Sequence, residues 1–217
     1  MNEPVLVTAL IVTCNHRPYV AAAIESALMQ RTKFSVEILI SEDASSDGTE
    51  EVVESYATAH PGLIEILSSV RRVGSNEVVA RGLRRARGRY IALLYGDDFW
   101  ISEAKLQIQA DYLETHLDFT AIFHNALIAS ENEVSDRRWT PSGHPAEVTL
   151  DDIWAGNPFA TCTGMMRTEC VRDIPSWYAE FFPITDWPLY VFCARRGKLA
   201  FVDNIVGVYR LHAGGLF

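Results

Sequence analysis

The chain has 217 residues, which suffices for one sizeable α/β domain and is too short for two full catalytic domains. Hydrophobic residues make up 48% of it and charged residues 22%, close to the average of globular proteins, so disorder, collagen and coiled coil are excluded as its main state. The formal net charge of −9 repels nucleic acid as a bulk partner, but it leaves room for an anionic small ligand held through a metal ion.

The first half of the chain alternates between strand and helix patterns. Residues 5–13 form a continuous apolar, β-branched run, which is typical of a strand buried on both faces. The expected strands are residues 5–13, 36–40, 63–67 and 90–94, and the expected helices are residues 19–29, 48–59 and 76–86. This alternation predicts an α/β fold with a mainly parallel sheet and helices on both faces.

The second half is less regular and is expected to be a small C-terminal elaboration of the same domain. It contains expected helices at residues 105–117 and 186–195 and expected strands at residues 120–129, 159–167, 198–202 and 206–210. Residues 131–147 are polar and contain two prolines and a glycine, so we expect a surface loop there. No internal repeat or clear linker interrupts the chain, which predicts a single domain over residues 1–217.

The cysteines and the N-terminal segment indicate a soluble cytoplasmic protein. The four cysteines form no CxxC pair and no disulfide-scaffold pattern, so reduced thiols fit best. The N-terminal segment has an acidic start rather than the basic start of a signal peptide, and no window approaches the roughly 18 apolar residues of a membrane span. Residues 71–89 contain seven arginines. They indicate either a solvated helix face or a docking surface for anionic lipid, so peripheral contact with the inner face of a membrane stays open.

Polar side chains follow three of the predicted strands. Thr13 and Asn15 follow the first strand, Asp43 follows the second, and Asp97 and Asp98 follow the fourth. Ligands of open parallel sheets bind outside the carboxyl ends of the strands. The grouping therefore predicts a single binding site at this edge, and the alternative is ordinary loop polarity.

Asp97 and Asp98 are the most informative pair. Two adjacent carboxylates after a buried strand repel each other unless a cation or hydrogen bonds compensate. Mg²⁺ and Mn²⁺ are typically held by one or two carboxylates plus substrate phosphates, so the pair predicts a diphosphate bound through a metal ion. The alternative is a turn that caps the next helix. The patterns GxGxxG, GxxxxGK[ST], HExxH and GxSxG are absent, which excludes a standard dinucleotide fingerprint and a P-loop.

Four segments taken together resemble the family 2 glycosyltransferases. They are VTALIVTCNHRPYVAAAIESALMQ, EILISEDASSDGT, GRYIALLYGDDFW and PITDWPLYVFCARRGKLAFVDNIVGVYRLHAGG, in the order and at the intervals of that family. The resemblance covers about residues 5–215. It implies the GT-A (Rossmann-like) fold, a nucleotide-diphosphate-sugar donor, a divalent metal ion (Mn²⁺ or Mg²⁺) and inversion at the anomeric carbon of the sugar.

The resemblance also implies which residues bind the donor. Asp43 would hydrogen-bond the base of the nucleotide, and Thr13 would lie under that base. Asn15 belongs to the same donor-binding group, and Asp97 would face the ribose. Cys14 stands where the family usually has a tyrosine, which weakens any aromatic contact with the base.

Three further residues are assigned to the metal ion and to catalysis by the same resemblance. Asp98 would ligate the metal, and His212 matches a histidine that reaches the diphosphate or the metal. Asp186 matches the catalytic base. The alternatives are an N-cap of the following helix for Asp186 and an ordinary loop histidine for His212. Tyr95 stands where the family often has a further acid, so metal binding depends on Asp98 with Asp97 nearby.

The expected reaction is a single displacement. Asp186 accepts the proton of an acceptor hydroxyl, which attacks the anomeric carbon from the face opposite the nucleotide. Residues 1–100 are expected to bind the nucleotide sugar, with a UDP-sugar as the first expectation, and residues 101–217 the acceptor. The acceptor is a glycan, a lipid-linked sugar or a protein, in the synthesis of bacterial surface polysaccharide or glycoconjugates.

Two other functions stay open on the sequence. A sugar-phosphate nucleotidyltransferase shares the nucleotide-binding architecture, but the segment TCNHRP lacks the glycine-rich, basic loop that such an enzyme needs after its first strand. A non-catalytic module that binds a nucleotide sugar or a glycan would bind the donor without transfer. The sugar, the base, the acceptor and the choice between Mn²⁺ and Mg²⁺ are not fixed by the sequence.

Overall fold

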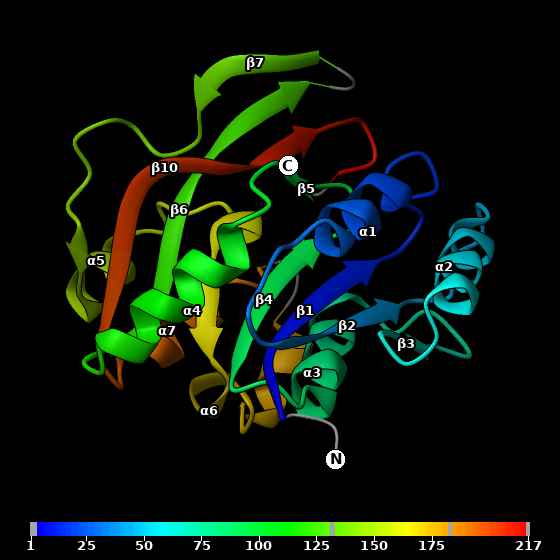
Figure 1. Cartoon of the computed structure of the whole chain (residues 1–217), viewed down its shortest axis with the longest axis horizontal. Coiled ribbons are helices and arrows are strands. Elements are labelled where there is room, and N and C mark those ends of the chain that lie inside the picture. Colours follow the sequence, from blue (N-terminus) through cyan, green and yellow to red (C-terminus); the bar gives the residue numbers. More distant parts are fainter. Residues whose placement is uncertain (1–3, 131–132, 182–183, 216–217) are drawn as a thin grey trace.

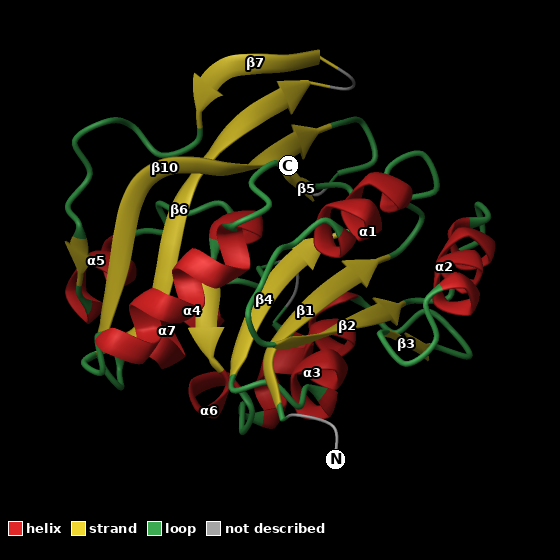
Figure 2. Ribbon diagram, in the orientation of Figure 1, coloured by secondary structure: helices red, strands yellow, loops and turns green. Residues whose placement is uncertain are grey.

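The computed structural model describes residues 4–130, 133–181 and 184–215 (Figures 1 and 2). The strands are β1 (Val5–Thr13), β2 (Ser35–Glu42), β3 (Ile64–Ser68), β4 (Tyr90–Tyr95), β5 (Phe99–Trp100), β6 (Phe119–Ser130), β7 (Glu133–Arg138), β8 (Glu147–Val148), β9 (Met165–Arg167) and β10 (Lys198–Leu211). The helices are α1 (Val20–Leu28), α2 (Thr49–Ala59), α3 (Ser75–Arg85), α4 (Lys105–Thr115), α5 (Leu150–Ala155), α6 (Thr168–Val171) and α7 (Trp187–Ala194), with 3₁₀ turns η1 (Thr161–Thr163) and η2 (Ser176–Glu180).

Ten strands of the described part form one sheet in the order β3-β2-β1-β4-β9-β6-β10-β5, with β7 beside β6 and β8 beside β10. The strands β1 to β4 of the first half run parallel to one another. Val7, Ala9 and Ile11 of β1 belong to the core with α1 and α2, whereas Leu10 and Val12 belong to the core with α3. Burial on both faces explains why this strand is a continuous apolar run, and it confirms the predicted α/β fold.

The second half makes the sheet mixed. β9 lies antiparallel between β4 and β6, and β6 and β10 run parallel to each other. The short strands β5, β7 and β8 pair antiparallel with their neighbours. Helix α4 joins the core on the face of α1, and α7 joins the core on the face of α3 (Figure 1). Helices therefore cover both faces of the sheet.

The loop predicted over residues 131–147 is wrong in part, because it contains β7 and the first residue of β8. Every side chain of β7 is exposed, so no hydrophobic alternation marks the strand in the sequence. Its pairing with the end of β6 supplies the hydrogen bonds that the pattern did not reveal. Residues 131–132 of the predicted loop lie outside the described residues.

Two predicted strand boundaries are also wrong. The strand predicted over residues 159–167 is a strand only at Met165–Arg167, because Thr161–Thr163 form a 3₁₀ turn. The two strands predicted at residues 198–202 and 206–210 are the single strand β10. Its register shifts between Val202 and Gly207, and exposed residues at this irregularity interrupt the apolar pattern.

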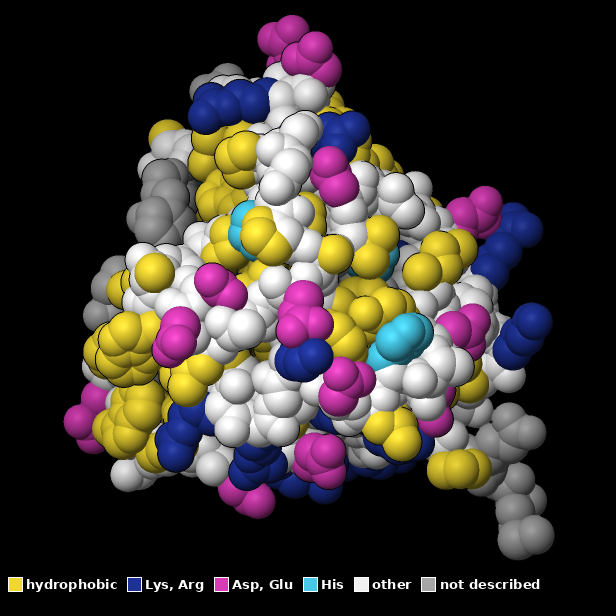
Figure 3. All heavy atoms as spheres, turned by 90° about the vertical axis from the view of Figure 1, so that its left-hand side faces the viewer, with side chains coloured by type: hydrophobic (Ala, Val, Ile, Leu, Met, Phe, Trp, Pro, Cys, Tyr) yellow, Lys and Arg dark blue, Asp and Glu magenta, His cyan; other side chains and the backbone are white. Residues whose placement is uncertain are grey.

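The arginines of residues 71–89 are largely paired. Guanidinium groups of Arg84, Arg85 and Arg89 lie 2.7 to 2.9 Å from carboxylates of α3 itself, β3 and α4, and Arg87 pairs with Glu37 at 2.5 Å. On the face that Figure 3 shows, basic side chains lie scattered among acidic ones. These contacts favour the solvated helix face over a docking surface for anionic lipid. Among the described residues, no helix combines the length and the apolarity that a membrane crossing requires.

Candidate active site

A cavity of about 860 Å³ opens beyond the carboxyl ends of β1, β2 and β4. Its lining includes five of the residues that the sequence singled out, although they come from distant parts of the chain: Thr13, Asp43, Asp97, Asp98 and Asp186. The segments before α3, around η1 and before α7 complete its wall. The parallel register of the first half thus brings the strand ends together, as an open α/β sheet does at its ligand site.

Asp43 fixes one wall of the cavity. Its carboxylate accepts hydrogen bonds from the backbone N–H groups of Val73 and Gly74, at 2.8 and 2.9 Å, and from the Ser69 hydroxyl at 3.1 Å. An ionised carboxylate has about four lone-pair sites. Asp43 therefore anchors the segment before α3 and keeps room for about one more donor from the cavity.

Thr13 and Asn15 differ in their position relative to the cavity. Thr13 is buried and lines the cavity. Asn15 is exposed and does not belong to the cavity lining. The backbone N–H of Asn15 donates to Ser45 Oγ at 2.9 Å, and its side-chain oxygen accepts from the N–H of Ser46 at 2.9 Å. Asn15 therefore joins the segment after β1 to the segment after β2.

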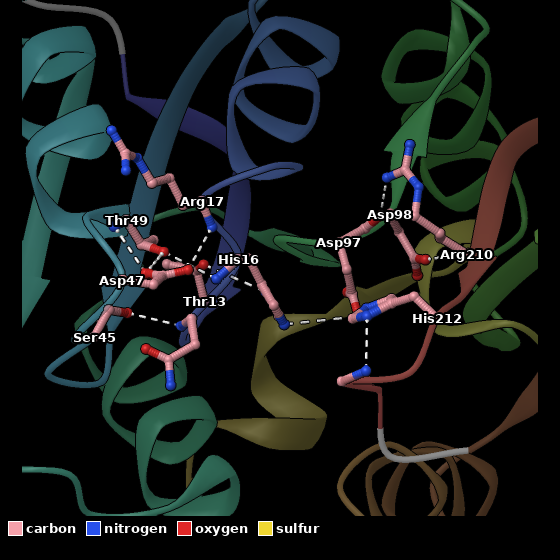
Figure 4. A network of polar contacts seen from close by, with 12 residues as sticks. Thr13, His16, Arg17, Ser45, Asp47, Thr49, Asp97, Asp98, Arg210 and His212 are labelled. Atoms are coloured by element: carbon pink, nitrogen blue, oxygen red, sulfur yellow. Dashed lines mark hydrogen bonds and ion pairs between the residues drawn. The ribbon is translucent and has the colours of Figure 1, made fainter. Parts of the chain in front are cut away.

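Asp97 lies between two histidines (Figure 4). Its Oδ2 atom is 3.1 Å from Nε2 of His212 and 3.7 Å from Nε2 of His16. Gly96 permits this approach, since a Cβ atom there would lie 2.6 Å from Thr13 Oγ1 and 2.9 Å from Nδ1 of His16. Carboxylate and imidazole groups so arranged are donors that suit a divalent metal ion.

Asp98 is buried beside Asp97. Its Oδ1 atom accepts the backbone N–H of Arg210 at 2.8 Å, whereas no N–H or O–H group of the described residues donates to its buried Oδ2 atom. Burial raises the pKa of Asp98 well above its usual value, and the negative charge of Asp97 acts in the same direction. A cation at this place would satisfy the second oxygen and would offset the repulsion between the two acids. The residues present therefore fit a divalent metal ion.

Asp186 lies directly before α7 and lines the cavity. Its Oδ1 atom accepts the N–H of Trp187 at 2.7 Å, which makes it the N-cap of the helix. Its Oδ2 atom accepts from the hydroxyl of Thr161 at 2.7 Å and from the amide of Asn157 at 3.1 Å. Burial raises the pKa of Asp186, which improves a carboxylate as a general base, while these three donors hold it in place.

The sequence reasoning missed His16 and Thr161. His16 follows the Thr13–Asn15 segment directly, so its position at a strand end was a usable signal. Thr161 belongs to the stretch predicted as a strand, and no pattern linked it to Asp186. Trp139 and Tyr209 also line the cavity, with ring centroids 4.4 Å apart, and neither was predicted as a site residue.

The sequence profile of Glycosyl transferase family 2 matches residues 8–171 of the chain. Uncharacterized protein Rv1520 of Mycobacterium tuberculosis is 32% identical over 207 residues, which are 95% of this chain and 59% of that protein. The Escherichia coli protein WfaP, a UDP-Glc:alpha-D-GlcNAc-diphosphoundecaprenol beta-1,3-glucosyltransferase, is 26% identical over 212 residues, which are 97% of this chain and 79% of WfaP. The chain thus spans less than two thirds of Rv1520.

Solved structures with the same fold are also known. S. aureus TarS 1-349 in complex with UDP-GlcNAc matches with a TM-score of 0.74 and 17% identity, over 97% of this chain and 60% of that one. The mannosyltransferase PcManGT from Pyrobaculum calidifontis, in complex with GDP-Man and Mn²⁺, matches with a TM-score of 0.67 and 16% identity, over 99% of this chain and 61% of that one. At this identity the two structures establish the fold alone.

Proposed function

Because the chain belongs to glycosyl transferase family 2, we propose that it transfers a sugar from a nucleotide-diphosphate sugar to an acceptor hydroxyl, with inversion at the anomeric carbon. One observation carries the proposal: Asp43, Asp98 and Asp186, from three distant segments, line the same cavity. A donor in this cavity would have its nucleotide near the ends of β1 and β2 and its sugar toward α7. Residues 1–100 would then bind the donor, and residues 101–217 would shape the acceptor side.

The base of the nucleotide is assigned to Asp43 and Thr13. Asp43 is already held by three internal donors, so it offers a fixed acceptor to an N–H group of the base. Thr13 lines the floor of the same region. Asn15 supports the donor site indirectly, through the contacts that join its segment to Ser45 and Ser46.

The diphosphate is assigned to the region that follows the carboxyl end of β4. Asp98 and His212 are the proposed metal-binding residues. Asp97 precedes Asp98 in the chain, contacts His212 and faces the position expected for the ribose. A divalent ion bound there supplies charge neutralisation for the departing diphosphate. These residues hold their carboxylates in place before any donor arrives, because Arg210 and His212 contact them directly.

Asp186 is the proposed general base. It accepts the proton of the acceptor hydroxyl while that oxygen attacks the anomeric carbon and the nucleotide leaves from the opposite face. About one lone-pair site remains for the acceptor hydroxyl, since Thr161, Asn157 and Trp187 occupy three of the four positions around the carboxylate. Burial raises the pKa of Asp186, which makes the carboxylate a stronger proton acceptor, while the hydrogen bonds from Thr161, Trp187 and Asn157 act in the opposite direction and stabilise its ionised form.

A donor of the UDP-sugar class and a lipid-linked or other glycan acceptor are proposed on the printed activity of WfaP. Such chemistry belongs to surface polysaccharide or glycoconjugate synthesis, and a lipid-linked acceptor would bring the protein to the cytoplasmic face of a membrane. One assay compares sugar transfer to a lipid-linked acceptor, to a free glycan and to a protein acceptor. Transfer to the protein acceptor alone would contradict the lipid-linked assignment.

The test is a panel of nucleotide sugars assayed for binding and for products. With Mn²⁺, one UDP-sugar should raise the Tm of the protein, because a ligand that binds only the folded state stabilises it. Turnover should release a nucleoside diphosphate and form a β-linked product from an α-linked donor. Release of pyrophosphate would indicate a nucleotidyltransferase instead. Binding with neither transfer nor slow donor hydrolysis would indicate a non-catalytic module.

A further inference from the structure

His16 is held rigidly where the segment after β1 enters α1. Its N–H donates to the Thr49 hydroxyl at 2.9 Å, and its C=O accepts from the N–H groups of Tyr19 and Val20 at 2.9 and 2.8 Å. The side chain is 14% exposed. Backbone contacts on both sides and a largely buried ring leave the imidazole little freedom to turn away from Asp97.

Three ligand atoms converge beside the cavity: Nε2 of His16, Oδ2 of Asp97 and Nε2 of His212 all lie within 4.8 Å of one another (Figure 4). Two ligands that bind one ion at about 2.1 Å are separated by roughly 3.0 to 4.2 Å, depending on the angle between the bonds. The distances from Asp97 Oδ2 to His212 and to His16, 3.1 and 3.7 Å, fall in that range. The cluster therefore has nearly the dimensions of a site for one ion.

The hydrogen bonds of the two rings differ in a way that matters for ligation. Nδ1 of His16 is 3.4 Å from the Thr13 hydroxyl, so a proton on Nδ1 can point to Thr13 and leave the Nε2 lone pair facing Asp97. Ligating histidines are oriented by this kind of contact from their other nitrogen. In His212, Nδ1 accepts the N–H of Gly214 at 3.2 Å, which places the ring proton on Nε2. His212 has to exchange that proton and release Gly214 before it ligates an ion, whereas His16 needs no such change.

We infer that the metal ion is held by His16, Asp97 and His212, with Asp97 rather than Asp98 as the carboxylate that shares the ion with the two rings, and that this set of two imidazoles and one carboxylate selects Mn²⁺, Co²⁺ or Zn²⁺ over Mg²⁺. The inference rests on the proposed function, because it concerns the metal ion of that reaction. Mg²⁺ prefers oxygen ligands and gives up its water reluctantly, whereas imidazole nitrogen favours transition-metal ions. A site formed by Asp98 and His212 without His16 would have one imidazole instead of two, so its preference for transition-metal ions would be weaker.

The experiment measures ion binding directly, apart from turnover. The full chain is titrated with Mn²⁺ in the absence of nucleotide, with free Mn²⁺ followed by electron paramagnetic resonance, and Mg²⁺ is added as a competitor. The wild-type protein should bind Mn²⁺ at least about tenfold more tightly than Mg²⁺. His16→Ala should lose about 10-fold to 100-fold in Mn²⁺ affinity while its Mg²⁺ affinity changes little.

Two further variants separate ligation from folding. His16→Gln keeps a polar side chain of similar reach and should fold, yet it should show the same loss of Mn²⁺ preference. His60→Ala removes a histidine at the end of α2, outside the cavity lining, and should bind Mn²⁺ as the wild type does. Unchanged Mn²⁺ affinity in both His16 variants would overturn this inference and leave the proposed function standing. Donor-dependent turnover with no Mn²⁺ or Mg²⁺ bound to the wild type would overturn both the inference and the metal assignment of the proposed function.

Discussion

The two halves of the chain supply the same cavity by different means. In the first half, Asp43 and Asp97 stand at the ends of parallel strands, so the register of the sheet decides where they lie. In the second half, Asp186 lies where a 3₁₀ turn and a helix start meet, and single hydrogen bonds from Thr161 and Asn157 orient it. Strand register tolerates many side-chain changes, whereas a site held by individual polar contacts depends on each of them.

The strongest way to sharpen this comparison is Asp186→Asn. The amide cannot accept the proton of the acceptor, so kcat should fall by about 10²-fold to 10⁴-fold, the usual worth of a general base. Donor affinity should stay the same, because the amide keeps the size of the side chain and the proposed contacts of the nucleotide are made by Asp43 and Thr13. The measurement is kcat together with the Tm increase that the donor causes. Full retention of turnover would remove Asp186 from the role of base.

A second prediction concerns the buried cation behind η1. Lys105 is fully buried, its Nζ atom donates to Gln109 Oε1 at 2.7 Å and to the C=O of Gly164 at 3.3 Å, and it lies 4.5 Å from the centroid of the Trp100 ring. Gln109 and Trp100 donate in turn to the C=O groups of Thr163 and Cys162. Three buried side chains thus hold the turn whose first residue orients Asp186.

Burial lowers the pKa of Lys105 to about 7, from 10.5. The unfolded chain therefore binds more protons than the folded chain between about pH 7 and 10.5, and the free energy of unfolding should rise with pH in this window, by at most about 1.4 kcal/mol per pH unit. Urea denaturation of wild type and Lys105→Met at pH 7, 8 and 9 measures this difference, with Lys33→Met as the exposed control. Equal pH dependence of wild type and Lys105→Met would show that the buried ammonium keeps its ordinary pKa.

A third prediction concerns one polar side chain in the first half, and its failure would contradict the comparison between the two halves. The Arg81 guanidinium donates to the hydroxyls of Ser41 and Ser69 and to the C=O groups of Glu42 and Leu67. These groups lie at the ends of β2 and β3. Arg81→Met should lower the free energy of unfolding by about 2 kcal/mol, since buried acceptors lose a charged donor.

The control for this variant is Arg84→Met in the same helix. Arg84 pairs with Glu77 on the surface at 2.7 Å, and its loss should change the free energy of unfolding by no more than about 0.5 kcal/mol. In Arg81→Met, donor affinity should fall much less than the free energy of unfolding, because the register of the strands, which positions the donor-binding residues, does not change. A loss of donor binding larger than the loss of stability would show that the first half also depends on single contacts at its site.

The sequence predicted the first half of the site better than the second for a physical reason. The ends of β1, β2 and β4 could be placed because a buried parallel strand is a continuous apolar run followed by polar residues, so Thr13, Asp43 and Asp97 were expected at one edge. The approach of His16 to Asp97 depends on how closely the two strand ends pack at Gly96, which no local pattern encodes.

In the second half, tertiary contacts replaced local patterns. β7 has no buried face, so no apolar alternation marks it in the sequence. β10 is one continuous strand, but exposed residues at its register shift interrupt the apolar pattern. Thr161 became visible as a partner of Asp186 only when η1 and the start of α7 were placed side by side. The resemblance to the family is the basis on which roles for Asp186 and His212 are predicted, because periodicity alone gives only a helix start and a strand end.

The smallest expected effect comes from Thr161, and it tests whether the second half depends on one hydrogen bond. Thr161→Val keeps the shape of the side chain and removes the donor to Asp186 Oδ2. The carboxylate then loses one of the groups that lower its pKa, so the acidic limb of the kcat profile should move to higher pH. Above that limb, kcat should fall by less than about tenfold, since Trp187 and Asn157 still hold Asp186. Thr161→Ser restores the hydroxyl and should restore the profile. An unshifted acidic limb in Thr161→Val would mean that the start of α7 alone orients Asp186. The acids of both halves would then be placed by secondary structure and not by single hydrogen bonds.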